Sequence, residues 1–156
     1  MQLNNGPKKA VFSRFKHNDL QHLQSTLTPK TDTLVVTEGI FSMDGDKGDI
    51  SGIAAILDNT NSNAWLMVDD AHAIGCIGEN GMGSSALPVH KITRRAPKID
   101  VLMGTFGKAI GTQGAFIAGS NELIEYMVNF SKHYVYSTAM PAAQARATRA
   151  SLQIMR

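Results

Sequence analysis

One lysine, Lys108, stands in a glycine-rich loop between two apolar segments. Four glycines surround it in the stretch DVLMGTFGKAIGTQGAFIAGS: Gly104, Gly107, Gly111 and Gly114. Glycine lets the backbone come close to a ligand. An amine held out of bulk water has a lowered pKa, and the neutral amine can attack a carbonyl carbon. The pattern therefore favours a lysine that forms a Schiff base, and the alternative is a plain β-turn with an exposed lysine.

Two common phosphate-binding patterns do not fit this loop. A GxxxxGK[ST] loop needs a glycine six positions before the lysine and a hydroxyl after it, where this chain has Leu102 and Ala109. The spacing of the glycines also excludes the GxGxxG pattern of dinucleotide-binding proteins.

A carboxylate and an imidazole follow the apolar run AWLMVDD. Asp69 and His72 stand three positions apart. A pyridine-ring cofactor carried by a lysine needs a carboxylate at its ring nitrogen, and a charge-assisted hydrogen bond suits that role. A nearby histidine can bond the phenolic oxygen of such a ring. The alternatives are an Asp-Asp pair that caps a helix and a metal site, although no HExxH or CxxC pattern supports a metal.

The segment TEGIFSMDGDKGD contains three aspartates at spacings that suggest a calcium loop. An EF-hand needs a glutamate at its twelfth position, where this chain has Ala55, so the segment is better explained as a tight turn. Glu38 and Ser42, at the end of the preceding strand, are candidates for contacts in a site.

Two hydroxyls, Ser137 and Thr138, precede a predicted helix in HYVYSTAMP. Hydroxyls and backbone amides at the start of a helix can bind phosphate. Helix capping alone explains them equally well.

The periodicity of the chain predicts alternating strands and helices. Apolar runs predict strands over 33–39, 64–70, 98–106 and 114–119, and helical spacing predicts helices over 17–27, 49–61, 120–135 and 140–155. Uniformly apolar strands between helices are typical of an α/β fold with a mainly parallel sheet and helices on both of its faces. In such sheets the functional residues gather in loops that follow the strands.

Composition excludes several classes of function. The chain has 156 residues, 43% of them hydrophobic, which is enough for one compact domain with its own core. A net charge of +2 without a long basic run gives no reason to expect nucleic-acid binding. No apolar run approaches the roughly 18 residues of a membrane span, and the lone Cys76 suits a reducing cytoplasm.

Four motifs together resemble the α-oxoamine synthases, which are pyridoxal-phosphate (PLP) enzymes of the aspartate-aminotransferase fold. They are VVTEGIFSMDGD, WLMVDDAHAIGCIGENGMGS, VLMGTFGKAIGTQGAF and HYVYSTAMP, and the resemblance covers the chain from about residue 10 onward. It implies that residues 1–156 form the central part of the PLP-binding large domain of this type I PLP fold. An N-terminal segment and a C-terminal small domain are then expected to be absent.

The resemblance also implies a role for each candidate residue. Lys108 would hold PLP as an internal aldimine, Asp69 would pair with the pyridinium nitrogen and His72 would bond the phenolic oxygen. Thr105 would contact the phosphate, Ser42 would lie beside the phenolic edge and Glu38 near the reaction centre. Ser137 or Thr138 would reach the cofactor of a neighbouring subunit, because members of the family are homodimers.

The motifs resemble most the biotin-biosynthesis branch of that family. Its members condense L-alanine with pimeloyl-CoA or a pimeloyl carrier protein and release carbon dioxide. In that chemistry Lys108 would remove the α-proton of the amino acid. Two alternatives stay open: another branch, such as the glycine C-acetyltransferases, and a non-catalytic α/β module that binds a partner or a phosphate ligand.

Overall fold

The computed structural model describes residues 10–60, 63–86 and 96–155, and its described part is built around one four-stranded sheet. The strands are β1 (Thr33–Glu38), β2 (Ala64–Asp69), β3 (Val101–Thr105) and β4 (Ala115–Gly119). The helices are α1 (Leu20–Thr26), α2 (Ile50–Asn59), α3 (Asn121–Phe130), α4 (Lys132–Val135) and α5 (Ala142–Met155), with two short 3-10 turns at Glu79–Gly81 and Gly83–Ala86.

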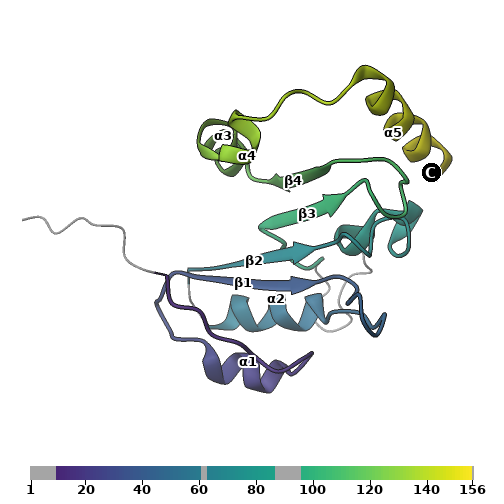
Figure 1. Cartoon of the computed structure of the whole chain (residues 1–156). Coiled ribbons are helices and arrows are strands. Elements are labelled where there is room, and N and C mark those ends of the chain that lie inside the picture. Colours follow the sequence, from purple (N-terminus) through teal and green to yellow (C-terminus); the bar gives the residue numbers. More distant parts are fainter. Residues whose placement is uncertain (1–9, 61–62, 87–95, 156) are drawn as a thin grey trace, which may run out of the picture.

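The sheet has the order β1-β2-β3-β4 along its width. Strands β1, β2 and β3 are parallel, and β4 runs antiparallel to β3, as the arrowheads in Figure 1 show. The predicted mainly parallel sheet is therefore confirmed. The expected strands agree with the observed ones within a residue, except that the third begins at Val101 and not at position 98.

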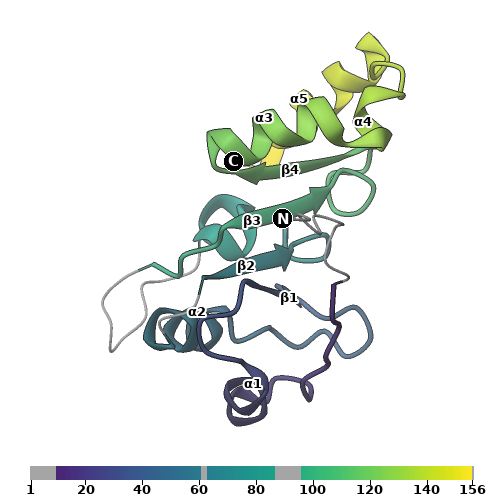
Figure 2. The ribbon, with the colours of Figure 1, turned by 90° about the vertical axis from the view of Figure 1, so that its left-hand side faces the viewer.

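Helices α1 and α2 cover one face of the sheet at β1 and β2 (Figures 1 and 2). Each begins where an aspartate side chain accepts a hydrogen bond from a backbone amide: Asp19 from His22 at 2.8 Å and Asp49 from Gly52 at 2.9 Å. These bonds satisfy amides that have no partner inside the helix. Position 61, at the end of the helix expected over 49–61, lies outside the described residues.

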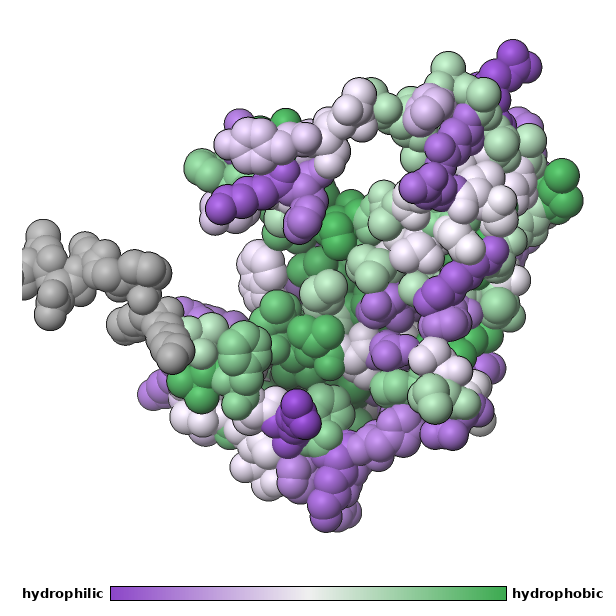
Figure 3. Space-filling model, viewed as in Figure 1, coloured by the Kyte–Doolittle hydropathy of each residue, from purple (hydrophilic) through white to green (hydrophobic). Residues whose placement is uncertain are grey.

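The core lies between this helix layer and the sheet. It consists of buried residues of α1, α2, β1 and β2: Leu23, Val35, Ile50, Ile53, Ala54, Leu57, Leu66 and Val68. Strand residues alternate between two faces. Leu34, Val36 and Trp65 therefore point to the opposite face, where their side chains are 54%, 51% and 46% exposed. At β1 and β2 that second face is less covered than the sequence predicts, and Figure 3 shows apolar residues gathered across the middle of the molecule.

The helix predicted over 120–135 is interrupted. Ser131 has extended backbone angles and ends α3, and its carbonyl then accepts the amides of Tyr134 and Val135 as α4 begins. Serine bonds readily to nearby backbone, which makes it a poor interior residue and a good cap. The helix predicted over 140–155 is confirmed as α5, with Pro141 directly before its first residue.

Candidate functional site

Three parallel strands deliver polar residues to the same edge of the sheet. Glu38, the last residue of β1, is the register partner of Asp69, the last residue of β2. Asp69 in turn pairs with Met103 of β3, two positions before Thr105, where β3 ends. The side chains of Glu38, Asp69 and Thr105 are half-buried. The structure thus gathers three of the predicted residues where the loops leave the strands, which is the usual place for a site in such sheets.

The carboxylate of Asp69 is held in a defined orientation. Its Oδ1 accepts the amide of Ala71 at 2.9 Å, and its backbone carbonyl accepts the amide of Gly39 at 2.9 Å. The chain then enters a tight turn that carries the half-buried His72. An anion and an imidazole therefore stand close along the chain at the edge of the sheet.

The loop after β3 carries Lys108 and is closed by its own backbone. Phe106 donates to Gly114 at 2.9 Å, and Gly111 donates to the carbonyl of Lys108 at 2.9 Å with a positive φ of 71°. A positive φ is comfortable only for glycine. Gly111 is thus explained by the turn itself, as is Gly114, which has a φ of 116°. Lys108 is exposed, so the expectation of an amine held out of water is wrong for this chain as the structure describes it, because the residue lies on a turn whose neighbours Gly107 and Ala109 are exposed as well.

Helix α5 anchors the same loop. Ser151 donates from Oγ to the carbonyl of Ile110 at 2.8 Å, and the hydroxyls of Thr148 and Thr112 lie 2.7 Å apart. Ile110 is itself 4% exposed. The lysine therefore sits on a loop whose far side is fixed by packing and hydrogen bonds, although its own side chain points to solvent.

The hydroxyl of Thr105 is an unsatisfied hydrogen-bonding group. Its Oγ1 is buried and has no hydrogen-bond partner among the described residues. Buried hydroxyls normally have a partner. A ligand oxygen at this edge of the sheet would supply one.

Ser42 lies in a tight turn after β1. The amide of Phe41 donates to the carbonyl of Asp46 at 2.9 Å, and Gly45 has a φ of 70°, so the predicted turn is confirmed. The side chain of Asp46 is held in place by His17 at 2.7 Å and by Asn18 at 2.8 Å. Ser42 itself is exposed.

Ser137 and Thr138 lie in the segment between α4 and α5. Both are exposed, and Ser137 donates from Oγ to the carbonyl of His133 in α4. The serine thus closes the preceding helix and does not cap α5. No hydrogen bond in the described part of the chain joins either hydroxyl to the other predicted residues.

A buried carboxyl that was not predicted from the sequence lies beside Asp69. Asp70 and Ser84 are both fully buried, and the amide of Ser84 donates to Oδ2 of Asp70 at 2.6 Å. Burial raises the pKa of Asp70, and the hydrogen bonds from Ser84 oppose that change. The Asp-Asp pair was the available signal, but nothing in the sequence links it to a serine 14 positions later.

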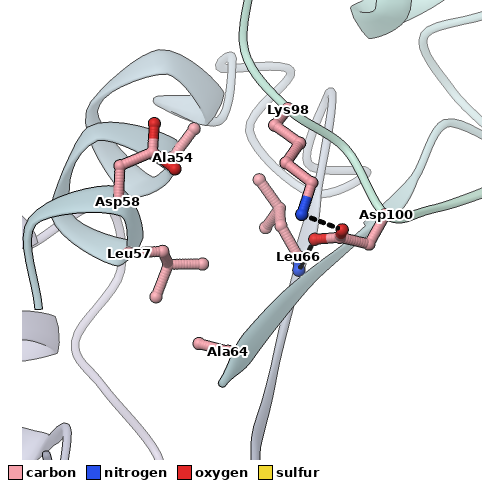
Figure 4. Close-up of a pocket in the computed structure, with 7 residues that line it drawn as sticks. All are labelled: Ala54, Leu57, Asp58, Ala64, Leu66, Lys98 and Asp100. Atoms are coloured by element: carbon pink, nitrogen blue, oxygen red, sulfur yellow. Dashed lines mark hydrogen bonds and ion pairs between the residues drawn. The ribbon is translucent and has the colours of Figure 1, made fainter. Parts of the chain in front are cut away.

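A pocket of about 200 Å³ opens at the opposite end of β2, away from the candidate site. It is lined by Ala54, Leu57, Asp58, Ala64, Leu66, Lys98 and Asp100. Figure 4 shows Lys98 reaching toward Asp100, at 2.7 Å, while the other carboxylate oxygen of Asp100 accepts the amide of Leu66 at 2.9 Å. The carboxylate is thus already engaged by the sheet itself.

The described ranges 10–60, 63–86 and 96–155 contain neither a candidate metal site nor a candidate membrane-spanning helix. No group of three histidine, cysteine, aspartate or glutamate side chains there is placed to hold a metal ion. No helix there is long and apolar enough to cross a membrane.

Comparison with known families places the chain among PLP-fold proteins. Residues 7–156 match the family model of aminotransferase class I and II. The chain is 49% identical over 148 residues to the 8-amino-7-oxononanoate synthase of Saccharophagus degradans, and 49% identical over 146 residues to that of Aeromonas hydrophila. These matches cover 94% and 93% of the chain but only 36% and 35% of the relatives, so the chain spans about a third of their length.

Solved structures share the fold. An 8-amino-7-oxononanoate synthase from Francisella tularensis is similar with a TM-score of 0.69 and 28% identity, over 92% of this chain and 39% of that one. The serine palmitoyltransferase of Sphingomonas wittichii is similar with a TM-score of 0.74 and 28% identity, over 91% and 35% of the two chains. A structure of SPT with its PLP internal aldimine has a TM-score of 0.74, 28% identity and the same coverage.

Proposed function

The chain belongs to the aminotransferase class I and II family, and on this premise we propose that it forms the core of a PLP-dependent C-acyltransferase. The proposed reaction condenses L-alanine with a pimeloyl thioester and releases carbon dioxide to give 8-amino-7-oxononanoate, a step of biotin biosynthesis. Residues 1–156 would belong to the large domain of that enzyme. The curated relatives described above support alanine and a pimeloyl donor over the glycine-using branch.

One structural observation carries the proposal. The register of β1, β2 and β3 brings Glu38, Asp69 and Thr105 to one edge of the sheet. The loop that follows β3 adds the amine of Lys108. A protein without a catalytic or binding site would not need these three groups at the ends of neighbouring strands: the amine of Lys108, the oriented carboxylate of Asp69 and the unsatisfied hydroxyl of Thr105.

The residues fit PLP as a resident cofactor. Thr105 Oγ1, which lacks a partner among the described residues, would donate to the phosphate. Asp69, oriented by the amide of Ala71, would hold the proton on the ring nitrogen by a charge-assisted bond. His72 and Ser42 would bond the phenolic oxygen, and Lys108 would attach to the carbonyl carbon. When bound, PLP lets negative charge on the α-carbon of an amino acid spread into its ring.

The chain's own groups then move and hold protons. Lys108 Nζ would take the α-proton of L-alanine, a role that needs an amine on a well-positioned loop. The hydrogen bonds from α5 to Ile110 and Thr112 supply that positioning. Glu38, half-buried and in register with Asp69, would lie beside the reacting atoms.

The assembly and the compartment are parts of the same proposal. A homodimer would let the exposed Ser137 or Thr138 of one subunit reach the cofactor of the other. The acyl donor would be pimeloyl-CoA or a pimeloyl carrier protein. The exposed thiol of Cys76 favours a reducing cytoplasm, where such a thiol stays reduced.

Exchange of the α-hydrogen of L-alanine in deuterated water tests this function. With added PLP the chain should speed the exchange above the rate given by PLP alone, and Lys108→Ala should lower that enhancement by about a hundredfold or more. Lys132→Ala, a change at another exposed lysine, is the matched control and should keep the enhancement. An enhancement that survives Lys108→Ala, or none in the unmodified chain, would contradict the proposal. The same assay with glycine in place of L-alanine compares the two amino acids as substrates, and so distinguishes the alanine-using branch of the family from the glycine-using branch.

A further inference from the structure

The turn after β1, residues 39–48, is held from outside by the side chain of Asn18. The nitrogen of this carboxamide donates to Oδ2 of Asp46 at 2.8 Å and to the carbonyl of Lys47 at 3.1 Å. Its oxygen accepts the amide of Asp49 at 3.3 Å. Asn18 therefore uses both its donor and its acceptor on one short segment, which lies 28 to 31 positions further along the chain.

His17 contacts the same turn. Its Nε2 lies 2.7 Å from Oδ2 of Asp46, and its ring meets the ring of Phe41 edge to face, with the two centroids 4.3 Å apart. A carboxylate only accepts hydrogen bonds, so the imidazole is the donor to Asp46. One carboxylate oxygen thus receives two donors from the segment that precedes α1.

The backbone of Asn18 is shaped for this contact. Its φ of 50° lies in the left-handed region, which asparagine, aspartate and glycine adopt more easily than other residues. The amide of Asp19 donates to the carbonyl of Lys16 at 3.1 Å and closes a turn around Asn18. Aspartate at position 18 could therefore keep the backbone and an acceptor but not the donor, and glycine could keep only the backbone.

The turn after β1 is also attached to the candidate site. The amide of Gly39 donates to the carbonyl of Asp69 at 2.9 Å, and the amide of Gly48 donates to the carbonyl of Gly39 at 3.1 Å. The turn is thus bonded to the end of β2 on one side and to Asn18 on the other. Ser42 stands between these two attachments along the chain.

We propose that Asn18 is a positioning residue, which holds the turn after β1 in the form that presents Ser42 to the phenolic oxygen of PLP. A hydroxyl on an exposed turn is placed only as firmly as the backbone that carries it. The hydrogen bonds of Asn18 to Asp46 and Lys47 fix that backbone. The inference rests on the proposed function for the bond that Ser42 makes, and on the structure alone for the attachment of the turn.

Hydrogen exchange in the chain without PLP tests the attachment. Asn18→Asp keeps the size, the positive φ and an acceptor, but it has no donor and brings a second carboxylate to Asp46. The amides of Phe41 and Gly48, whose bonds to the carbonyls of Asp46 and Gly39 close the turn, should exchange at least about tenfold faster in this variant. NMR resolves these amides one by one.

Asn63→Asp is the matched control for this measurement. Asn63 donates from Nδ2 to Oδ1 of Asp32 at 3.2 Å, so the same change is made in another asparagine–aspartate pair, at the opposite end of β1. It should leave the exchange of Phe41 and Gly48 unchanged. Unchanged exchange of these two amides in Asn18→Asp would overturn the proposal. An equal increase at the amides inside α2 would also overturn it, because the whole chain would then have become less stable.

The pH midpoint of the visible absorption band after addition of PLP tests the positioning role. Ser42→Ala should shift this midpoint, because it removes a donor from the phenolic oxygen. Asn18→Gly removes the side-chain bonds without adding charge and accepts the φ of 50°. It should shift the midpoint in the same direction, and it should add almost nothing when residue 42 is already alanine. Asn63→Gly should leave the midpoint unchanged.

The outcomes separate the inference from the proposed function. A shift from Asn18→Gly that is equally large with and without Ser42, or no shift where Ser42→Ala gives one, would refute positioning. Absence of the band from the unmodified chain, or a midpoint that Ser42→Ala does not move, would instead refute the proposed role of this turn in binding PLP. The exchange of Phe41 and Gly48 would then decide the attachment of the turn by itself.

Discussion

Replacement of Leu66 by alanine tests whether the α1 and α2 layer forms the main core of this chain. Leu66 lies in the middle of β2 and is 1% exposed, within the same cluster as Ile50, Ile53 and Leu57. Truncation of such a side chain removes its transfer free energy and leaves a cavity. The expected loss is about 3 kcal/mol of the free energy of unfolding. For a domain of ordinary stability this is a large part of the total.

Leu34→Ala is the matched control. Leu34 lies on the neighbouring strand β1 and points to the opposite face, where its side chain is 54% exposed. The same atoms are removed, but about half of their surface already meets water and no closed cavity forms. The expected loss is therefore about 1 kcal/mol or less.

Urea denaturation followed by far-UV circular dichroism measures both variants. Dichroism is preferable to tryptophan emission because Trp65 is the register partner of Leu34 and the neighbour of Leu66, so its emission would change locally. With a typical urea slope of about 1–3 kcal/mol/M, Leu66→Ala should lower the midpoint by about 1 M or more. Equal losses for the two leucines would refute the assignment of the core to one face of the sheet.

Three further predictions concern the turn after β1, a helix cap and an exposed ion pair. Gly39→Ala should lower the free energy of unfolding by about 1–3 kcal/mol, because the added Cβ would lie 2.1 Å from the buried Oδ1 of Asp70. Gly107→Ala is the control: its added Cβ would lie 3.7 Å from the nearest atom, so it should lower the free energy of unfolding far less in the same urea assay. Asp49→Ala should cost about 1 kcal/mol by removing the cap of α2, and Asp49→Asn should restore most of it; no loss on Asp49→Ala would show that the cap is not stabilising. Lys98→Met should cost less than about 1 kcal/mol, because Lys98 is 70% exposed, and 1 M salt should reduce the effect. The hydrogen bond and charge of Asp100 raise the pKa of Lys98, so the contribution of the pair should be present below about pH 10 and lost as the pH rises through the folded value, and an effect that grows at high pH would contradict this sign.

The elements with strong periodicity were predictable from sequence. The run of β-branched residues after Thr33 and the apolar run ending at Asp69 became β1 and β2 almost residue for residue. The break at Ser131 was not predictable from periodicity, because the apolar spacing continues through it. The extended backbone conformation of Ser131 divides the helix, and local hydrogen bonds determine whether a serine adopts that conformation.

The candidate site was predictable to the level of its loops and no further. Parallel strands place their carboxyl ends at one edge, so the proximity of Glu38 and Asp69 followed from the fold class. The exposure of Lys108 did not follow from the fold class, because it depends on how the loop turns after β3. The pairing of Asp70 with Ser84 joins positions 14 residues apart through a turn without a regular period, and only the structure brings them together.

The site of covalent attachment of PLP tests the central claim most directly. The chain is incubated with PLP, reduced with borohydride, digested, and the labelled peptide is identified by mass spectrometry. One dominant label is expected on Lys108, and the label should be weaker when Asp69→Ala removes the carboxylate from the ring nitrogen. A label spread over the other exposed lysines, with Lys108 no more reactive than Lys132, would contradict the assignment of this edge of the sheet as a PLP site.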